Sequence, residues 1–526
     1  MILRGASYVS RLSNWNCRGR AVRGLTATST GGDTIFALSS GPITKTGVAV
    51  IRLSGPQSSN CLQGLLAKGS KLPEPRRASL RKLFCPKTGD CLDSALVLWM
   101  PGPKSFTGED IVELHVHGSR AVILGLFEAF EHLDKQQGQG GVRAAERGEF
   151  TRRAFDNGRM DLTEVEGLAD LLAADTALQR TQALRQMDGH LRETFEGWRG
   201  DLVRCLAHTE AVIDFGDDDR EDDVDDSTLY ALEPRVRDLA ALIRSHLKDG
   251  RRGELVREGV KIALVGPPNA GKSSLINALA RRPAAIVSPV AGTTRDVVEV
   301  RLELAGLPCL VSDTAGLRPK EAASDEVEVE GMNRARAAYL DAQLRVFVCD
   351  GSDESSVKAG ASMLAQLQAE EAEAEAKPHS QAQAQGQGQG QGQDKRSIRL
   401  IQVMNKVDLG PSPALDSNQQ QKQVYGVSCT TGAGLPELEA ALAAAIKSML
   451  EESAGEGALI TRERHRRHLE QCVAHLERFL GQHGRLPMDA AAEELRLAAL
   501  ELGRITGRVD VEELLDVIFR DFCIGK

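Results

Sequence analysis

The chain of 526 residues is 41% hydrophobic and 26% charged, and its formal net charge is −9. This length predicts about three or four domains with sizeable cores, and the acidic balance argues against a protein that grips nucleic acid by itself, because phosphate neutralisation normally dominates such affinity. No run approaches the roughly 18 apolar residues of a membrane span, so no span is predicted.

The first 32 residues differ in composition from the rest of the chain. They contain no acidic residue before Asp33, several serines and threonines, and five arginines: Arg4, Arg11, Arg18, Arg20 and Arg23. This composition is typical of an organellar transit peptide. A basic tail that binds RNA is the alternative. The arginine content and short length favour the mitochondrion over the chloroplast.

Residues 33–157 predict an α+β domain of short strands and two helices, one of them from Arg120 to His132. His115 and His117 alternate along a predicted strand, so their side chains share a face. We interpret both as structural or substrate-pocket groups, because no third metal ligand is evident.

Residues 158–254 carry an almost continuous helical pattern. Between Leu162 and Leu172, apolar residues recur at the three- and four-residue spacing of one helix face. The acidic run from Asp214 to Asp226 is predicted to be a solvated loop.

A phosphate-binding motif lies near the start of residues 255–448. Gly266 to Ser273 fits G-x-x-x-x-G-K-[ST], follows an apolar run at Val260–Val265 and opens a helical stretch. In this strand–loop–helix context, backbone N–H groups cradle phosphate oxygens at a helix N-terminus. Lys272 is expected to reach the β- and γ-phosphates, and the Ser273 hydroxyl to ligate Mg²⁺.

Three later motifs identify the base and complete the site. Asn405-Lys-Val-Asp408 follows an apolar strand, and an Asp there can accept both the N1–H and the exocyclic amine of guanine. Asp313-Thr-Ala-Gly316 is expected to supply Asp313 to the Mg²⁺ shell and the Gly316 N–H to the γ-phosphate. Ser428-Cys-Thr430 is a weaker element over the base. This ordered set predicts GTP binding and resembles the Ras-like GTPase domain.

The residues expected to contact GTP are Asn269, Ala270, Gly271, Lys272, Ser273, Ser274, Ser288, Pro289, Val290, Ala291, Gly292, Thr293, Thr294, Asp313, Thr314, Ala315, Gly316, Asn405, Lys406, Val407, Asp408, Ser428 and Cys429. Leu317 stands where Ras-type switches place the Gln that positions the attacking water, so that group must come from elsewhere. A K⁺ ion caged by Asn269 and the loop 284–294 would act as an arginine finger does, an effect of about 10³–10⁵ in rate. The alternative is that Asn269 only braces the loop. The expected ligands are Ser273 and Thr294 for Mg²⁺, and Asn269, Ser288, Val290 and Thr293 for K⁺.

Two segments complete the chain. Residues 369–396 form an Ala/Glu and then Gln/Gly tract that cannot bury a core, which predicts a disordered insertion. Residues 449–526 are helical again as far as Phe522 and end in Cys523-Ile-Gly-Lys526.

Several segments together carry a resemblance to one family: Gly47–Gly55, Ser105–Gly118, Gly148–Leu162, Ala284–Asp296, Asp313–Glu328 and Cys523–Lys526. With them the chain, from about Asp33 to its end, resembles the MnmE (TrmE) family of tRNA-modification GTPases. The resemblance implies an N-terminal α+β domain, residues 33–157, that binds folate and forms a homodimer. It further implies a Ras-like, doubly wound GTPase domain, residues 255–448, inserted into an all-α domain built from residues 158–254 and 449–526.

The resemblance also implies a second ligand site. Arg52, Glu113 and Arg159 match residues that hold 5-formyltetrahydrofolate or a related tetrahydrofolate, joined by Lys526. The family often has Lys where this chain has Arg159, which changes the geometry of that contact.

Two catalytic residues are implied in the same way. Glu328 matches the family position proposed to orient water, although three extra residues precede it here. Cys523 is expected to act as a nucleophile or an acid–base group in uridine chemistry, with its pKa lowered by Lys526. The alternative is that Cys523 is a small apolar plug.

The implied function is a GTP-hydrolysing enzyme that works with an FAD protein resembling MnmG (GidA). Together they would install a 5-aminomethyl-type group, carboxymethylaminomethyl or taurinomethyl, on the wobble uridine of certain tRNAs. A ribosome-assembly GTPase switch of an organelle, like Era or Der, is the first alternative, and the acidic balance and the Cys-Ile-Gly-Lys ending speak against it. A folate-sensing scaffold is the second, and intact Lys272, Asp313 and Asp408 argue against it.

A cluster of basic residues follows residue 460: Arg462, Arg464, His465, Arg466, Arg467 and His468. They form one helical patch that either contacts tRNA or is the solvated face of an amphipathic helix. Most of the affinity for tRNA is expected to come from a partner protein.

Overall fold

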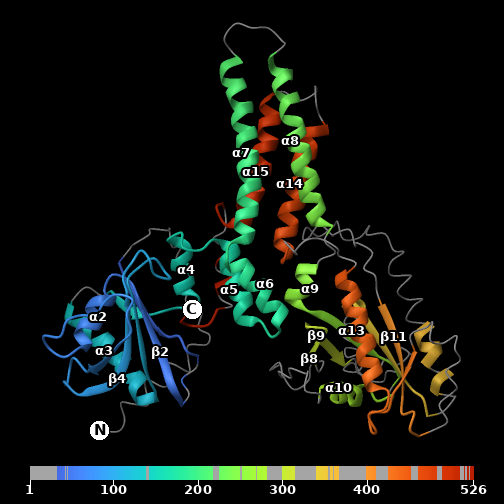
Figure 1. The fold of residues 1–526 in the computed structure, drawn as a ribbon, viewed down its shortest axis with the longest axis horizontal. Helices are drawn as coiled ribbons and strands as arrows, with labels where there is room; N and C mark the ends of the chain where they lie inside the picture. Colours follow the sequence, from blue (N-terminus) through green and yellow to red (C-terminus); the bar gives the residue numbers. More distant parts are fainter. Residues whose placement is uncertain are drawn as a thin grey trace, which may run out of the picture. The chain divides into compact units, whose positions relative to one another are not determined.

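The structure is a computed structural model, and it describes residues 32–41, 43, 45–137, 141–216, 224–248, 252–267, 269–280, 299–313, 339–352, 356–358, 360–365, 399–409, 424–451, 460–481, 488–509, 515, 518–519 and 522–525. Residues 1–31 of the predicted transit peptide (residues 1–32) and the predicted insertion 369–396 lie outside these. The chain divides into two compact units: Met1–Arg159 with Asp516–Lys526, and Met160–Leu515 (Figure 1).

The first unit is built on a six-stranded sheet in the order β3-β4-β5-β2-β1-β6. Its strands are β1 (Thr34–Leu38), β2 (Thr46–Ser54), β3 (Ser79–Phe84), β4 (Cys91–Met100), β5 (Ile111–Gly118) and β6 (Val142–Ala144). Neighbouring strands are antiparallel except β1 and β6, which are parallel.

Three helices accompany this sheet, rather than the two predicted: α2 (Ser58–Leu65), α3 (Arg120–Gln137) and α4 (Glu149–Asp156). α2 and α3 pack on one face, where Phe36 of β1 belongs to the core. Side chains alternate along a strand, so Ile35 and Ala37 face the other way and pack with Phe150 of α4. α2 and α4 have eight residues each, too few for their periodicity to stand out in the sequence.

The second sheet has the order β12-β11-β10-β7-β9-β8, with all neighbours parallel except β8 and β9. Its strands are β7 (Val260–Val265), β8 (Glu299–Leu304), β9 (Leu307–Asp313), β10 (Leu344–Asp350), β11 (Arg399–Asn405) and β12 (Val424–Gly426). The helices α10 (Lys272–Ala280) and α13 (Leu435–Glu451) pack on one face, and a separate apolar cluster covers the other. This is the doubly wound, Ras-like arrangement predicted for the nucleotide-binding domain.

The remaining helices of the second unit are α5 (Leu162–Ala173), α6 (Ala177–Met187), α7 (His190–Gly216), α8 (Val224–Leu247), α9 (Arg252–Glu258), α14 (Glu463–Gly481) and α15 (Met488–Thr506). α7, α8, α14 and α15 lie side by side and share one hydrophobic core (Figure 1). The acidic run predicted as a loop is helical at both ends, because α7 continues to Gly216 and α8 begins at Val224. None of the helices described is both long and apolar enough to cross a membrane.

The basic patch of α14 is mostly buried, so both interpretations of it as a surface were wrong. His465 Nε2 lies 2.9 Å and Arg464 Nη2 3.1 Å from carboxylate oxygens of Glu166. Three further pairs hold the neighbouring side chains: Arg462–Asp170 (2.8 Å), Arg466–Glu254 (3.1 Å) and His468–Glu501 (2.7 Å). Of the six basic residues, only Arg467 is exposed. The acidic partners lie on α5, α9 and α15, which the local sequence pattern cannot reveal.

Glu166 is the centre of this cluster and is almost fully buried. Burial by itself would raise the pKa of Glu166, but Arg464, His465 and Arg462 around it hold that pKa well below its usual range. Burial lowers the pKa of His465, although Glu166 opposes this change. The cluster therefore joins α5 to α14 through a charged carboxylate.

Candidate functional site

The phosphate loop lies between β7 and α10, as predicted. A Cβ at Gly266 would collide with the Val348 carbonyl oxygen, and a Cβ at Gly271 would collide with Asn405 Nδ2. Both glycines have positive φ angles, +156° and +88°, and Asn269 between them has a φ of +63°. Only a residue without a side chain fits at the two glycine positions, so the glycines let the loop pack closely against β10 and the end of β11.

Lys272 is buried at the first turn of α10. Its Nζ donates hydrogen bonds to Gly266 O (3.0 Å) and Pro267 O (2.9 Å), so the ammonium group is held inside the loop. Asn405 Nδ2 donates to Ala270 O (2.9 Å) from the end of β11. The structure thus brings together the first and the later predicted motifs.

The base-recognition segments are also adjacent. Val407 N donates to Val427 O (3.3 Å), and Val427 N donates to Met404 O (2.8 Å), which fixes residues 405–408 beside Ser428 and Cys429. Asp408 is exposed at this edge, as a carboxylate that pairs with guanine must be. The pKa of the Cys429 thiol is raised overall, mainly by burial and also by Asp408, although the hydrogen bond with Asn405 opposes this change. The thiol therefore stays protonated.

Lys406 has a partner that the sequence analysis missed. Its Nζ lies 2.6 Å from Asp350 Oδ2 at the end of β10. Asp350 Oδ1 in turn accepts hydrogen bonds from Ser352 N (3.0 Å) and Ser352 Oγ (2.6 Å). Burial by itself would raise the pKa of Asp350. Lys406 and Ser352 lower this pKa overall, which keeps the carboxylate charged. Adjacent parallel strands place Asp350 opposite Asn405, a register that local motifs do not encode.

Several predicted contacts lie outside the described residues: Ser288, Pro289, Val290, Ala291, Gly292, Thr293, Thr294, Thr314, Ala315, Gly316, Glu328 and Lys526. The backbone of Asp313 ends β9 and pairs with Leu264 of β7, one residue before the end of that strand. This register places Asp313 at the same sheet edge as the phosphate loop.

In the first unit, Arg52 of β2 and Glu113 of β5 form a cross-strand pair. Glu113 Oε1 lies 2.9 Å from Arg52 Nε and 2.7 Å from Arg52 Nη2. The Arg52 guanidinium also lies 5.5 Å from the ring centroid of Phe106 and 5.8 Å from that of Phe150. Both aromatic residues lie in segments that the sequence analysis quoted, but nothing there indicated their contact with Arg52.

Arg159 lies nearby but makes a different contact. Its Nε donates to Ser105 O (3.1 Å), and Ser105 precedes the Phe106 that packs beside Arg52. His115 Nε2 is 3.7 Å from Glu113 Oε2, on the same face of β5. The structure therefore places Arg52 and Glu113 in contact and connects Arg159 to them through residues 105–106.

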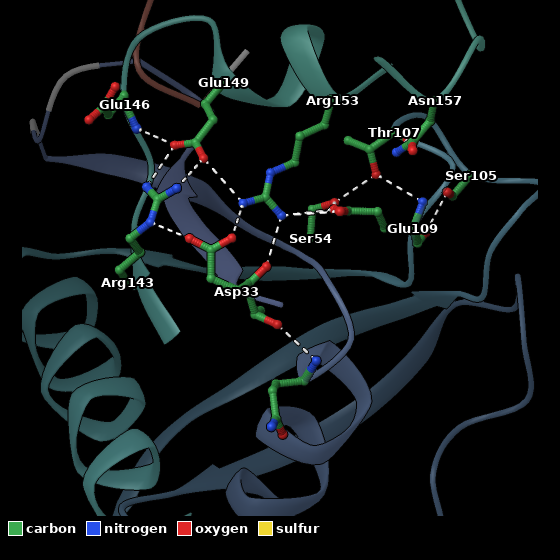
Figure 2. A network of polar contacts seen from close by, with 12 residues as sticks. Asp33, Ser54, Ser105, Thr107, Glu109, Arg143, Glu146, Glu149, Arg153 and Asn157 are labelled. Carbon is green, nitrogen blue, oxygen red and sulfur yellow. Dashed lines mark hydrogen bonds and ion pairs between the residues drawn. The ribbon is translucent and has the colours of Figure 1, made fainter. Parts of the chain in front are cut away.

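A network of charged side chains anchors α4 to the start of β1 (Figure 2). Arg153 bonds to Asp33 Oδ1 (2.9 Å) and to Glu109 Oε2 (3.1 Å), and Arg143 bonds to Glu149 Oε2 (2.9 Å). Burial would raise the pKa of Asp33, but Arg143 and Arg153 lower it overall. Local sequence patterns do not reveal this network, because its members are up to 120 residues apart.

The C-terminal tail belongs to the same unit. Ile524 forms an antiparallel bridge with Arg147, and Ser39 Oγ donates to Gly525 O (3.0 Å). Cys523 is a free and exposed thiol, so the alternative interpretation as an apolar plug was wrong. The buried anchor of the tail is instead Phe522.

The chain matches two family models: "GTP-binding protein TrmE N-terminus" over residues 34–159 and "MnmE helical domain" over residues 162–523. It is 48% identical over 496 residues to the tRNA modification GTPase MnmE of Parvibaculum lavamentivorans, which covers 94% of this chain and 100% of that protein. It is 45% identical over 502 residues, 94% of both chains, to the mitochondrial 5-taurinomethyluridine-[tRNA] synthase subunit GTPB3 of Homo sapiens. The bacterial and mitochondrial relatives are thus similar to this chain over nearly the same length.

Proposed function

The chain belongs to the MnmE family of tRNA modification GTPases, and we propose that it hydrolyses GTP in the modification of wobble uridines in tRNA. The observation that carries this function is the hydrogen bond from Asn405 Nδ2 to Ala270 O, which joins the guanine-recognition segment to the phosphate loop. One nucleotide can therefore be held at its base and its phosphates by the same rigid sheet edge.

The residues of the loop supply most of the binding. Free backbone N–H groups at a helix N-terminus point outward from the helix, so those at the start of α10 would bind phosphate oxygens favourably. Lys272 would exchange its bonds to Gly266 O and Pro267 O for bonds to phosphate oxygens. Such an exchange keeps the buried ammonium paired in both states, which a buried charge requires.

The metal ligands would come from the phosphate loop and from residues 284–294. Ser273 and Thr294 would hold Mg²⁺, which neutralises charge on the phosphates. Asn269, Ser288, Val290 and Thr293 would hold K⁺, and the left-handed conformation of Asn269 supports a special role for that residue. Glu328 would orient the attacking water. Hydrolysis measured in K⁺ and in Na⁺ tests the cation site: faster hydrolysis in K⁺ is expected, and equal rates would exclude it.

Arg52, Glu113, Arg159 and Lys526 would hold the tetrahydrofolate that supplies a one-carbon unit. The donor set fits: Glu113 can accept from the pterin edge, and the arginines suit the glutamate tail or formyl oxygen. Phe106, which already packs against Arg52 and is partly exposed, adds apolar surface for a ring. Loss of 5-formyltetrahydrofolate binding in Arg52→Ala is the expected result in calorimetry, and unchanged binding would remove this site.

The chain would act as a homodimer, through its N-terminal domain, with an FAD protein similar to MnmG. The mitochondrial relative is named for taurinomethyluridine, which supports taurinomethyl over carboxymethylaminomethyl as the group installed.

The arginine-rich residues 1–32 and that relative together support a mitochondrial location over a chloroplast one. No observation favours the ribosome-assembly alternative, and burial of the α14 patch removes one basic surface that it could have used.

The domain arrangement is part of the proposal. Residues 33–157 would form the folate-binding domain, and residues 255–448 a GTPase domain inserted between helical residues 158–254 and 449–526. The common core of α7 and α8 with α14 and α15 supports an insertion, because these helices lie on both sides of the nucleotide-binding segment in the sequence.

Depletion of the protein, followed by mass spectrometry of nucleosides from organellar tRNA, tests the function. The modified wobble uridine should disappear and return with the wild-type chain but not with Lys272→Ala. Lys261→Ala is the control, because Lys261 lies in the same sheet but is exposed and pairs with Asp341. Unchanged nucleosides after depletion would refute the function.

A further inference from the structure

We propose that Gly148 is a positioning residue that seats the C-terminal tail and so fixes the place of Cys523. Gly148 is the residue before α4 and has a φ of +68°. A Cβ at this position would lie 2.7 Å from Phe519 O and 3.0 Å from Phe519 Cα. These are backbone atoms, so a side chain at residue 148 would displace the chain that leads to Cys523.

Residues near Gly148 also contact the tail, and we call Leu38, Ser39, Arg147 and Gly148 together the seat. Arg147 forms the antiparallel bridge to Ile524. On the other side of the tail, Ser39 Oγ donates to Gly525 O, and a Cβ at Gly525 would lie 2.5 Å from Leu38 O. The tail is thus held by close backbone contacts on both sides of Cys523.

Two buried aromatic side chains that precede Cys523 anchor the tail. Phe519 and Phe522 are buried, and their ring centroids lie 6.1 Å apart. By contrast, Cys523 and Ile524 are exposed. The result is a fixed backbone with its thiol turned to solvent, which suits a group that must reach a substrate rather than fill a core.

The seat is itself held in place by the charged network at α4 (Figure 2). Glu149, the residue after Gly148, pairs with Arg143 of β6, and Arg153 on the next turn pairs with Asp33 before β1. Because Arg153 and Glu149 are mostly buried, these pairs are less screened by solvent than surface ion pairs.

The inference rests on the proposed role of Cys523 in uridine chemistry, so its test has a readout that does not depend on that role. The variant is Gly148→Ala, and Gly89→Ala is the matched control. Gly89 has a similar φ of +79°, but a Cβ there meets nothing within 4 Å. Both variants carry the same kind of backbone strain, and only the first one pushes against the tail.

Three quantities are measured on the full chain: tRNA modification, GTP hydrolysis, and the rate at which iodoacetamide labels Cys523. Cys91, an exposed thiol of the same unit, is the internal reference for labelling. In Gly148→Ala, modification should fall by about 10²-fold, the effect of a misplacement of roughly 1 Å. The labelling rate of Cys523 relative to Cys91 should change, and GTP hydrolysis should not. Gly89→Ala should leave all three as they are.

Ser39→Ala is a gentler second variant, in case Gly148→Ala fails to fold. It removes only the bond to Gly525 O, and Ser40→Ala is its control, because Ser40 Oγ bonds instead to Val50 N. Ser39→Ala should change the relative labelling of Cys523, and Ser40→Ala should not. Unchanged labelling and modification in Gly148→Ala, or in Ser39→Ala if the first variant is unfolded, would overturn the seat. If labelling changes but Cys523→Ser still modifies tRNA, the proposed role of the cysteine fails and the seat stands.

Discussion

Asp408 is the residue on which the identity of the base depends. In Asp408→Asn, one acceptor becomes a donor, so guanine loses a charge-assisted pair and xanthine gains a matching one. With about 1.5–3 kcal/mol for each bond to a charged group, GTP affinity should fall about 10²–10⁴-fold. Titration with GTP and xanthosine triphosphate measures the exchange. If the variant binds GTP as the wild type does, Asp408 does not read the base.

Asp350 is expected to position Lys406 for the nucleotide. Both side chains are partly exposed, so their pair contributes about 1 kcal/mol or less, and Asp350→Asn should weaken GDP binding at most about fivefold. The same change made in a Lys406→Ala background should have no further effect. An equal loss in both backgrounds would mean that Asp350 acts on the strand rather than on Lys406.

The residues of the nucleotide site were predictable to different degrees. The phosphate loop and Asn405–Asp408 are continuous motifs, so their chemistry can be inferred from spacing alone. Arg52 and Glu113 are 61 residues apart and were found only through a resemblance; their cross-strand contact is a product of the sheet register. Asp350 and Gly148 were missed, because what they do depends on a neighbour that only the fold provides.

At the scale of elements, the basic residues of α14 were predicted to lie on the surface but are mostly buried in ion pairs. Glu166→Gln would leave Arg464 and His465 facing a neutral side chain in a buried site, which should cost about 3–5 kcal/mol. Arg467→Gln, on the same helix but exposed, should change stability by less than about 0.5 kcal/mol. Urea unfolding followed by the fluorescence of Trp198, a core residue of these helices, in a chain whose Trp15 and Trp99 are replaced by Phe, measures both. Similar stability of the two variants would contradict the buried cluster.

The same cluster predicts a loss of stability in acid. The pKa of Glu166 is lowered from its ordinary value of 4.5, so its contribution is present above about that pH and is lost as pH falls below it. The pKa of His465 is lowered from 6.5, so its contribution is also present at higher pH and lost on acidification. In Glu166→Gln the part of this pH dependence due to the carboxylate should disappear.

Helix and strand positions were largely predictable, and their partners were not. The apolar run Val260–Val265 became β7 with those bounds, and the run before Asn405 became β11. The long helical pattern after residue 158 became α5 to α9. The acids that neutralise α14 are about 30 to 300 residues away in sequence, so periodicity could identify a charged face but not its burial.

At the scale of the whole molecule, the two proposed chemistries belong to different units of the chain. The nucleotide-binding sheet belongs to the second unit, whereas Arg52, Glu113 and the Cys523 tail belong to the first. Variants of the tail should therefore separate the two activities, because Cys523 makes no part of the nucleotide site. Motif spacing predicted the nucleotide site and a family resemblance implied the second site, but the attachment of the last residues to the first unit required the structure.

The most direct test of the account measures phosphate release and wobble-uridine modification in the same reaction for Cys523→Ser. The reaction contains the full chain, the FAD partner protein, tRNA, GTP and the tetrahydrofolate. We expect phosphate release close to that of the wild type and no modified uridine in the nucleoside mass spectrum. Full modification by this variant would contradict the account, as would loss of phosphate release in a variant whose thermal unfolding is unchanged.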